Sequence, residues 1–424
     1  MIKKENALSY LQNDVCRATL AALYPYQEMD VVIARYTSIL DQFEAIFGRK
    51  EEIAILSAPG RSEIGGNHTD HQGGHVVSAS INLDAVGIAA PNGTSLIRLQ
   101  SQGHDRYEVD ISDVSIQESE KNTTAALLRG VAARFVEMGY PVAGFDAYVS
   151  SDVLPGSGLS SSATFEVWTG VAINHLFCGD SVSAEEIAKI SQYAENHYFG
   201  KPSGLQDQMA SSVGGMIAID FADRENPIIE KLPFEFSDMA LCIIDSGGDH
   251  SNLTDEYAAI PQEMGQIASA FQQDRMCGVK KADFLSKIPA LRKQFGDRAV
   301  LRAFHFLKED KRAIDEAQAL KQRDLPRFLS LVKASGESSY MYLQNIYPTG
   351  AVQHQEVAIA LALCDEYLDG QGAFRVHGGG FAGTIQAFVP RAMLDAFVRG
   401  MDGALGAGSC HVLSIRPVGG TVIA

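Results

Sequence analysis

Cysteine is scarce in this chain, and the spacing of the cysteines excludes two common uses of the thiol. Only six of the 424 residues are cysteine, and no two of them form a Cys-x-x-Cys pair. Disulfide-stapled small domains and structural zinc sites both depend on closely spaced cysteines. We therefore expect reduced thiols in a cytoplasmic protein. The N-terminal Met-Ile-Lys-Lys-Glu-Asn contains no apolar stretch, so the sequence predicts no signal peptide.

Positive charge and long apolar runs are also in short supply. The chain has 35 Lys and Arg against 52 Asp and Glu, which gives a formal net charge of −17 at pH 7. An acidic surface repels nucleic acid and anionic membranes, so we expect neither as a partner. No apolar run approaches the roughly 20 residues that a membrane helix needs. The 46% of hydrophobic residues instead predicts a globular protein of two or three structural units sharing a large core.

The most informative segment is 58–74, Ala-Pro-Gly-Arg-Ser-Glu-Ile-Gly-Gly-Asn-His-Thr-Asp-His-Gln-Gly-Gly, which follows a predicted strand at 52–57. It combines a cation, carboxylate groups, two imidazoles and five glycines, a mixture that a hydrophobic core does not need. A pocket for a polyhydroxylated ligand does need it. The alternative is a metal site, which would use His68, Asp70, His71 and His75. Gly73-Gly74 make the segment too irregular to favour that reading.

A second glycine-rich segment, 154–163, reads Leu-Pro-Gly-Ser-Gly-Leu-Ser-Ser-Ser-Ala and lies between a predicted strand and a predicted helix. Glycines let the backbone approach an anion, and the free N–H groups at a helix start point towards it. A turn with serine caps is the alternative, but three serines exceed what capping needs. The Walker A pattern and the protein-kinase signatures are absent, and Ser161 replaces the third glycine of a dinucleotide fingerprint.

Three further segments complete a pattern. They are Ala194-Glu195 with Pro202–Gln208, His250-Ser251 with Glu256-Tyr257, and His377-Gly-Gly-Gly-Phe-Ala-Gly383. In order and spacing, the five segments resemble the galactokinase family of the GHMP kinase superfamily, from about residue 43 to the C-terminus. The resemblance implies an α+β, two-lobed GHMP kinase fold. A ribosomal-protein-S5-domain-2-like N-terminal lobe would span 1–230, and a ferredoxin-like C-terminal lobe 231–424, with the active site between them.

The resemblance also implies an activity and a set of site residues. The reaction would be ATP-dependent, Mg²⁺-assisted phosphorylation of the anomeric hydroxyl of galactose, by a monomer or weak homodimer. Asp207 would accept the proton of the sugar hydroxyl, and Arg61 would stabilise the transferring phosphoryl group and depress the pKa of Asp207. Ser162 and Glu195 would hold magnesium. The expected ATP-binding residues are Gly156, Ser157, Gly158, Leu159, Ser160, Ser161 and Ser162. The expected sugar-binding residues are Asn67, His68, Asp70, Gly204 and Tyr257.

Each of these assignments has a simpler structural alternative. Asp207 could be only a helix N-cap, Glu195 a solvated helix residue and Tyr257 a core residue. The sequence also departs from the family signature, since Asn67 replaces a glutamate, Glu63 an asparagine and Gly65 a bulkier apolar residue. In the family that glutamate contacts the distal end of the sugar.

The neutral Asn67 leaves three other sugars open as substrates: galacturonate, N-acetylgalactosamine and L-arabinose. Two further alternatives are a non-catalytic sensor of sugar and ATP and a kinase for a non-sugar alcohol such as mevalonate or homoserine.

The secondary-structure signals change along the chain. Residues 1–50 are expected to be helical, and Asn92-Gly93 is expected to form a hairpin turn between two strands. Strands are also predicted at 76–80, 85–90, 96–99, 373–376 and 384–388, and long helical regions at 122–138, 255–271, 308–331 and 352–368. The boundary between the two halves is expected near 220–240.

Overall fold

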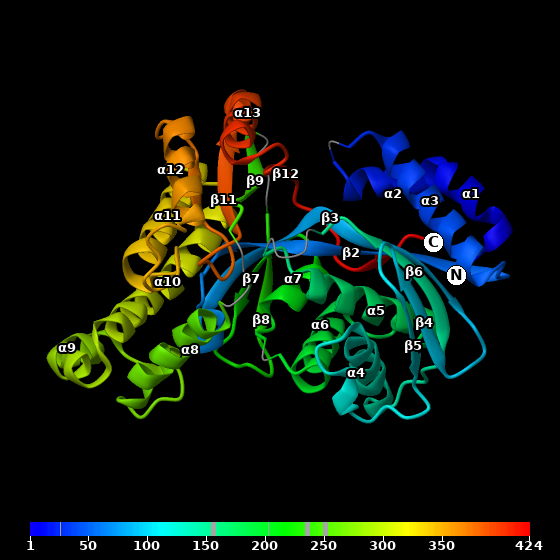
Figure 1. The fold of residues 1–424 in the computed structure, drawn as a ribbon, viewed down its shortest axis with the longest axis horizontal. Helices are drawn as coiled ribbons and strands as arrows, with labels where there is room; N and C mark the ends of the chain where they lie inside the picture. The colour runs from blue at the N-terminus through cyan, green and yellow to red at the C-terminus, as the bar shows by residue number, and fades with distance from the viewer. Residues whose placement is uncertain (26, 154–157, 202, 234–237, 249–252) are drawn as a thin grey trace.

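A nine-stranded sheet built mainly from the first half of the chain is the larger of two sheets in the computed structural model (Figure 1). The structure describes residues 1–424 except 26, 154–157, 202, 234–237 and 249–252. The main strand order is β1-β2-β3-β6-β4-β5, while β7 continues from β3 to β8 and β13 pairs with β2. The strands are β1 (Ile2–Lys3), β2 (Glu52–Gly65), β3 (His75–Pro91), β4 (Leu96–Ser101), β5 (Arg106–Asp110), β6 (Phe145–Ser151), β7 (Met216–Asp220), β8 (Ile228–Leu232) and β13 (Thr421–Val422).

Helices cover both faces of this sheet. Successive residues of β2 point to opposite faces, so Ile53 and Ile55 pack with the N-terminal helices, whereas Ala54 and Leu56 join the core on the other side. The N-terminal helices are α1 (Lys4–Gln12), α2 (Asp14–Leu23) and α3 (Met29–Phe47). The helices of the other side are α4 (Thr124–Glu137), α5 (Ser161–Phe177), α6 (Ala184–Tyr193) with its π-helical extension Ala194–Phe199, and α7 (Gln206–Val213). Figure 1 shows the two helical layers above and below the strands.

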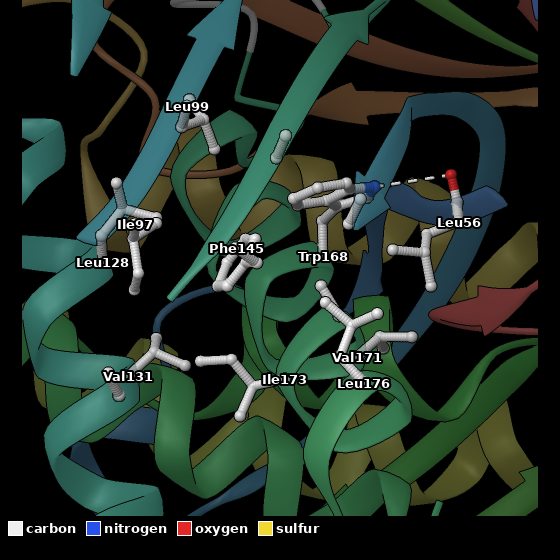
Figure 2. Close-up of a cluster of buried hydrophobic side chains, with 14 of the residues drawn as sticks. Leu56, Ile97, Leu99, Leu128, Val131, Phe145, Trp168, Val171, Ile173 and Leu176 are labelled. Atoms are coloured by element: carbon white, nitrogen blue, oxygen red, sulfur yellow. Dashed lines mark hydrogen bonds between the residues drawn. The ribbon is translucent and has the colours of Figure 1, made fainter. Parts of the chain in front are cut away.

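The core beneath the sheet is close-packed around the single tryptophan (Figure 2). Trp168 on α5 is fully buried, and its indole N–H donates to the Leu56 carbonyl at 3.4 Å. A Cβ at Gly87 would lie 2.5 Å from the Trp168 ring, so β3 needs a glycine where the indole crosses it. This packing holds α5 against β2 and thereby fixes where the start of α5 lies.

The second sheet has four strands in the order β10-β11-β9-β12. These are β10 (Ala373–Val376), β11 (Thr384–Pro390), β9 (Met239–Asp245) and β12 (Cys410–Leu413). Its helices, together with those that connect it to the first sheet, are α8 (Thr254–Ser269), α9 (Lys281–Phe295), α10 (Asp297–Lys321), α11 (Leu325–Ser338), α12 (Glu356–Leu368) and α13 (Leu394–Leu405). After β12 the chain returns to the first sheet as β13, so both termini lie beside the N-terminal helices (Figure 1). No helix of the described ranges is long and apolar enough to cross a membrane.

Three element predictions are wrong. Asn92-Gly93 does not close a hairpin, because β6 lies between β3 and β4 and pairs with both. The segments 76–80 and 85–90 form one continuous strand, β3. The single helical region predicted at 308–331 is divided between α10 and α11. Arg323 adopts a left-handed φ of 56°, and Asp324 then caps a new helix by accepting from the Arg327 N–H at 3.0 Å.

Candidate active site

An arginine and a carboxylate from distant segments meet at the centre of the site. Arg61 lies near the end of β2, where the pairing with β3 shifts register between Pro59 and Arg61. Asp207 lies in the first turn of α7. The Arg61 Nε donates to Asp207 Oδ1 at 2.6 Å, and an Arg61 Nη donates to the Gly158 carbonyl. The predicted catalytic pair is therefore in direct contact, with the glycine–serine loop beside it.

The surroundings of Asp207 keep its carboxyl ionised. Burial acts to raise the pKa of Asp207, but the Arg61 charge and the hydrogen bonds from Arg61 and Ser160 outweigh it and hold that pKa below its usual value. The Ser160 hydroxyl donates to Asp207 Oδ2, so both carboxylate oxygens are engaged. Asp207 is not the N-cap of α7, because the cap position is occupied by Leu205 and Asp207 lies inside the first turn.

The described part of the glycine–serine loop leads directly into α5. Gly156 and Ser157 lie outside the described residues. Gly158 and Ser160 both have left-handed φ values, 70° and 63°, and α5 begins at Ser161. Leu159 is fully buried in the core, and its carbonyl accepts from the Arg61 N–H at 3.2 Å. The loop thus presents backbone groups and the Ser161 and Ser162 hydroxyls at a helix N-terminus, a geometry suited to phosphate.

A second carboxylate, Glu195, faces the same helix start from the π-helical segment after α6. The Ser162 hydroxyl donates to Glu195 Oε1 at 3.2 Å, and Lys201 Nζ donates to the same oxygen at 3.1 Å. Gln208 Nε2 bridges Glu195 Oε2 and Glu166 at 2.8 and 3.0 Å. Burial and the Glu195 charge raise the pKa of Glu166 well above its usual range. The sequence analysis assigned no such roles to Lys201, Gln208 and Glu166, although Gln208 is the last residue of the motif 202–208 and Lys201 directly precedes it.

Four of the five expected sugar-binding residues line one cavity of about 1330 Å³, namely His68, Asp70, Gly204 and Tyr257. Asp70 abuts Gly204, since a Cβ at that glycine would lie 2.3 Å from Asp70 Oδ2. The neighbouring His250-Ser251, quoted for the same motif as Tyr257, lie outside the described residues. Gly204 and Leu205, which line the cavity, directly precede α7, the helix that carries Asp207.

His68 faces the cavity as a neutral imidazole. Its Nε2 lies 3.1 Å from the Gly379 carbonyl, which can only accept, so Nε2 carries the proton. Burial, with a smaller effect of His71, lowers the pKa of His68 to about 4. Tyr257 is bonded to the same glycine turn, because its hydroxyl donates to the Gly380 carbonyl at 2.9 Å.

Asn67 lies behind the cavity wall, in contrast to the expectation that it contacts the sugar. It is fully buried, and its amide is engaged by Glu63, Gly378 and Asn345. The alternative of a metal site at His68, Asp70, His71 and His75 is also not supported. Among the described residues no three histidine, cysteine or acidic side chains are grouped to hold a metal ion, and His75 turns away to Asp310.

Known proteins share both the motifs and the fold. Family models match at residues 41–91, the galactokinase galactose-binding signature, and at 126–215, the N-terminal domain of GHMP kinases. A galactokinase of Glaesserella parasuis is 30% identical over 361 residues, which cover 84% of this chain and 90% of that protein. A galactokinase of Lactobacillus helveticus is 29% identical over 365 residues, covering 85% and 91%.

The solved structure of Lactococcus lactis galactokinase complexed with galactose matches with a TM-score of 0.79 at 24% sequence identity. The match covers 92% of this chain and 99% of that one. The two family models include the first two glycine-rich motifs, and the similarity to the Glaesserella protein extends over most of both chains. The chain therefore belongs to the galactokinase family, and its two sheets form the two-lobed α+β fold of the GHMP kinases.

Proposed function

We propose that this protein is an ATP-dependent sugar kinase that phosphorylates the anomeric hydroxyl of galactose, giving galactose 1-phosphate and ADP. The observation that carries the proposal is the contact between Arg61 and Asp207 at 2.6 Å, beside a glycine–serine loop at the start of α5. Phosphoryl transfer needs positioning and charge neutralisation more than covalent help, and these groups supply both.

In this proposal Asp207 binds the sugar hydroxyl and accepts its proton, or orients it. The carboxyl is ionised at neutral pH because its pKa is held below the usual value, so it can act as an acceptor. Arg61 keeps Asp207 in place and stabilises charge on the transferring phosphoryl group, a role in which an arginine is worth roughly 10³–10⁵ in rate. The loop 156–162 binds the nucleotide phosphates.

The residues around Glu195 fit a magnesium ion. Ser162 and Glu195 offer hard oxygen ligands, and the buried Gln208 Oε1 has no hydrogen-bond partner among the described residues. Magnesium would neutralise charge on the ATP phosphates there. In this structure Lys201 and Ser162 both donate to Glu195 Oε1. We propose that Lys201 contacts a phosphate of bound ATP.

The sugar is proposed to lie against His68, Asp70, Gly204 and Tyr257, which line the same cavity. The neutral His68 and the ionisable Asp70 provide a donor and an acceptor suited to hydroxyl groups. We further propose that the protein is cytoplasmic, since the six cysteines are free thiols. Its proposed oligomeric state is a monomer or weak homodimer.

The first test is ADP release from ATP and Mg²⁺ with a panel of acceptors, and NMR of each product. The panel is galactose, N-acetylgalactosamine, galacturonate, L-arabinose, glucose and mevalonate. Turnover on galactose with a 1-phosphate product supports the proposal. Turnover on another acceptor alone would replace galactose by that compound. ATP and sugar binding without turnover on any acceptor would identify a sensor instead of an enzyme.

Asp207→Asn tests the proposed chemistry directly. The substitution preserves shape but removes the proton acceptor, so kcat should fall by about 10²–10⁴ while ATP affinity is retained. Steady-state kinetics and ATP titration of the same preparation measure both quantities. The control is Asp223→Asn, at an exposed loop residue whose carboxyl accepts from the backbone N–H groups of Glu225 and Asn226. Near-normal turnover of Asp207→Asn would remove Asp207 from the mechanism.

A further inference from the structure

A buried polar network centred on Asn67 joins β2 to the glycine turn between β10 and β11. The Asn67 Nδ2 donates to Glu63 Oε1 at 2.9 Å and to the Gly378 carbonyl at 2.7 Å. Its Oδ1 accepts from Asn345 Nδ2 at 3.0 Å and from the Ser339 hydroxyl at 3.2 Å. A side-chain amide has two donors and two acceptor positions, and all four are used here. The orientation of Asn67 is therefore fixed by protein groups alone.

The glycine turn is held by side chains at three successive carbonyls. Asn67 bonds the carbonyl of Gly378, and Asn345 and His68 both bond that of Gly379, at 3.2 and 3.1 Å. The Tyr257 hydroxyl bonds the carbonyl of Gly380. Two of these side chains, His68 and Tyr257, also line the cavity proposed for the sugar. The position of the turn thus determines where these two side chains lie.

The conformation of the turn requires glycine, and its backbone is closely packed. Gly378 and Gly380 have φ values of 63° and 80°, which disfavour other residues. A Cβ at Gly379 would lie 2.5 Å from the Tyr257 ring. The ring thus packs directly on the turn backbone, and a displacement of the turn would displace Tyr257.

Glu63 anchors the other end of the network. Its Oε1 accepts from an Arg375 Nη at 2.6 Å, and Arg375 lies on β10 just before the turn. Arg375 is fully buried and Glu63 nearly so, so this ion pair between the two lobes is shielded from solvent. Asn67 and Arg375 both donate to the same Glu63 oxygen. Glu63 and Asn67 therefore connect the first motif to the glycine turn as one unit.

We propose that Asn67 is a positioning residue that, with Glu63, holds the 378–380 turn against β2 and so sets the affinity for the sugar without touching it. This inference rests on the proposed function, because sugar affinity is one of its readouts. It differs from direct recognition in its consequence for specificity. Loss of the network should weaken every sugar by a similar factor, whereas loss of a direct contact would change the preference between sugars.

The test substitution is Asn67→Asp, which keeps the shape and replaces the amide donors with a carboxylate oxygen. That oxygen would face Glu63 and the Gly378 carbonyl, neither of which can donate to it. The KM for every sugar turned over should rise about tenfold, with the KM for ATP unchanged. Ser339→Ala is a milder second variant that removes one donor to Asn67 and adds no charge, so the sugar KM should rise about threefold.

The matched control is Asn174→Asp. Asn174 is also buried, and its Nδ2 also donates to a backbone carbonyl, that of Val182, at 3.0 Å. It lies on α5, and within the described part of the chain it shares no hydrogen-bond partner with the turn. Asn174→Asp should lower the free energy of unfolding about as much as Asn67→Asp does, and it should leave the sugar KM unchanged. Amide hydrogen exchange of the ligand-free proteins provides a second readout. Peptides that cover 377–383 should exchange faster in Asn67→Asp than in wild type, and at the wild-type rate in the control.

Three outcomes would overturn the inference: unchanged exchange in the turn, an equal rise of the sugar KM in the control, or an altered ratio of efficiencies between two sugars. The last would assign Asn67 a direct contact. If the wild-type protein phosphorylates no sugar, the proposed function fails. The exchange comparison still decides whether Asn67 holds the turn, because it requires no turnover.

Discussion

The surroundings of Gly65 leave no room for a larger side chain while Glu316 keeps its position. A Cβ on Gly65 would lie 1.6 Å from the Glu316 Oε2, which reaches β2 from α10. Glu316 is fully buried, and neither of its carboxyl oxygens has a hydrogen-bond partner among the described residues. Burial and the nearby Glu309 charge raise the pKa of Glu316 well above its usual range, which favours the neutral carboxyl. The bulkier apolar residue of the family signature could not coexist with Glu316 in this arrangement.

Gly65→Ala should therefore destabilise the protein by about 1–3 kcal/mol through overpacking. In a protein that already carries Glu316→Ala, the Gly65→Ala substitution should cost much less stability than it does in wild type, because the colliding carboxyl is gone. Urea unfolding of the four proteins in a double-mutant cycle measures the coupling. Additive effects of the two substitutions would contradict the contact.

At the scale of elements, His75 links the first sheet to α10. Its Nδ1 lies 2.8 Å from Asp310 Oδ1, and its Nε2 lies 3.4 Å from Asp220 Oδ2 on the neighbouring strand β7. The hydrogen bond that the His75 imidazole donates to Asp310, reinforced by the charges of both carboxylates, raises the pKa of His75. The protonated imidazole thus holds two carboxylates from separate elements.

The raised pKa gives this link a defined pH dependence. Its contribution to stability is fully present below the unfolded-state pKa of about 6.5, and it is lost as the pH rises through the higher folded-state value. His75→Gln should therefore cost more stability at pH 5.5 than at pH 9, by about 0.5–1 kcal/mol because the pair is partly exposed. Urea midpoints at the two pH values measure the difference. The control is His354→Gln at an exposed histidine. An equal cost at both pH values would contradict the assignment.

Local sequence identified the side chains that meet at the proposed catalytic pair better than it identified their surroundings. Arg61, Asp207 and Ser162 could be placed because the family motifs hold them within short segments whose backbone geometry is set locally. Asn67 could not, because its amide partners Ser339 and Asn345 lie 272 and 278 residues further along the chain. The failed hairpin at Asn92-Gly93 has the same cause, since β6 enters between β3 and β4 from beyond α4.

At the scale of the whole molecule, one buried carboxylate joins the beginning of the chain to its end. Asp84 on β3 accepts from Tyr24 at 2.5 Å, from Arg35 on α3 at 2.7 Å and from Arg416 at 2.8 Å, and also from the Ser57 hydroxyl. Burial acts to raise the pKa of Asp84, but the charges of Arg35 and Arg416 outweigh it and keep that pKa below its usual value. The N-terminal helices, of which only the end of α3 lies within a matched family region, are thus fastened to the sheet by an ionised group.

Tyr24→Phe should weaken this connection without affecting catalysis. The substitution removes one hydrogen bond to a buried carboxylate, so the free energy of unfolding should fall by about 1.5–3 kcal/mol. Tyr36→Phe is the matched comparison, because its hydroxyl bonds that of Tyr24 at 2.8 Å and not the carboxylate, and it should cost about 0.5–1.5 kcal/mol. Both tyrosines lie in the core above the sheet, whereas α5 and α7, which carry the proposed phosphate-binding serines and Asp207, lie below it (Figure 1). The kcat of the folded fraction should therefore match wild type in both variants. A fall in kcat with Tyr24→Phe alone would instead show that the N-terminal helices act on the site through Asp84, whose carbonyl bonds the N–H of Asp152 just before the glycine–serine loop.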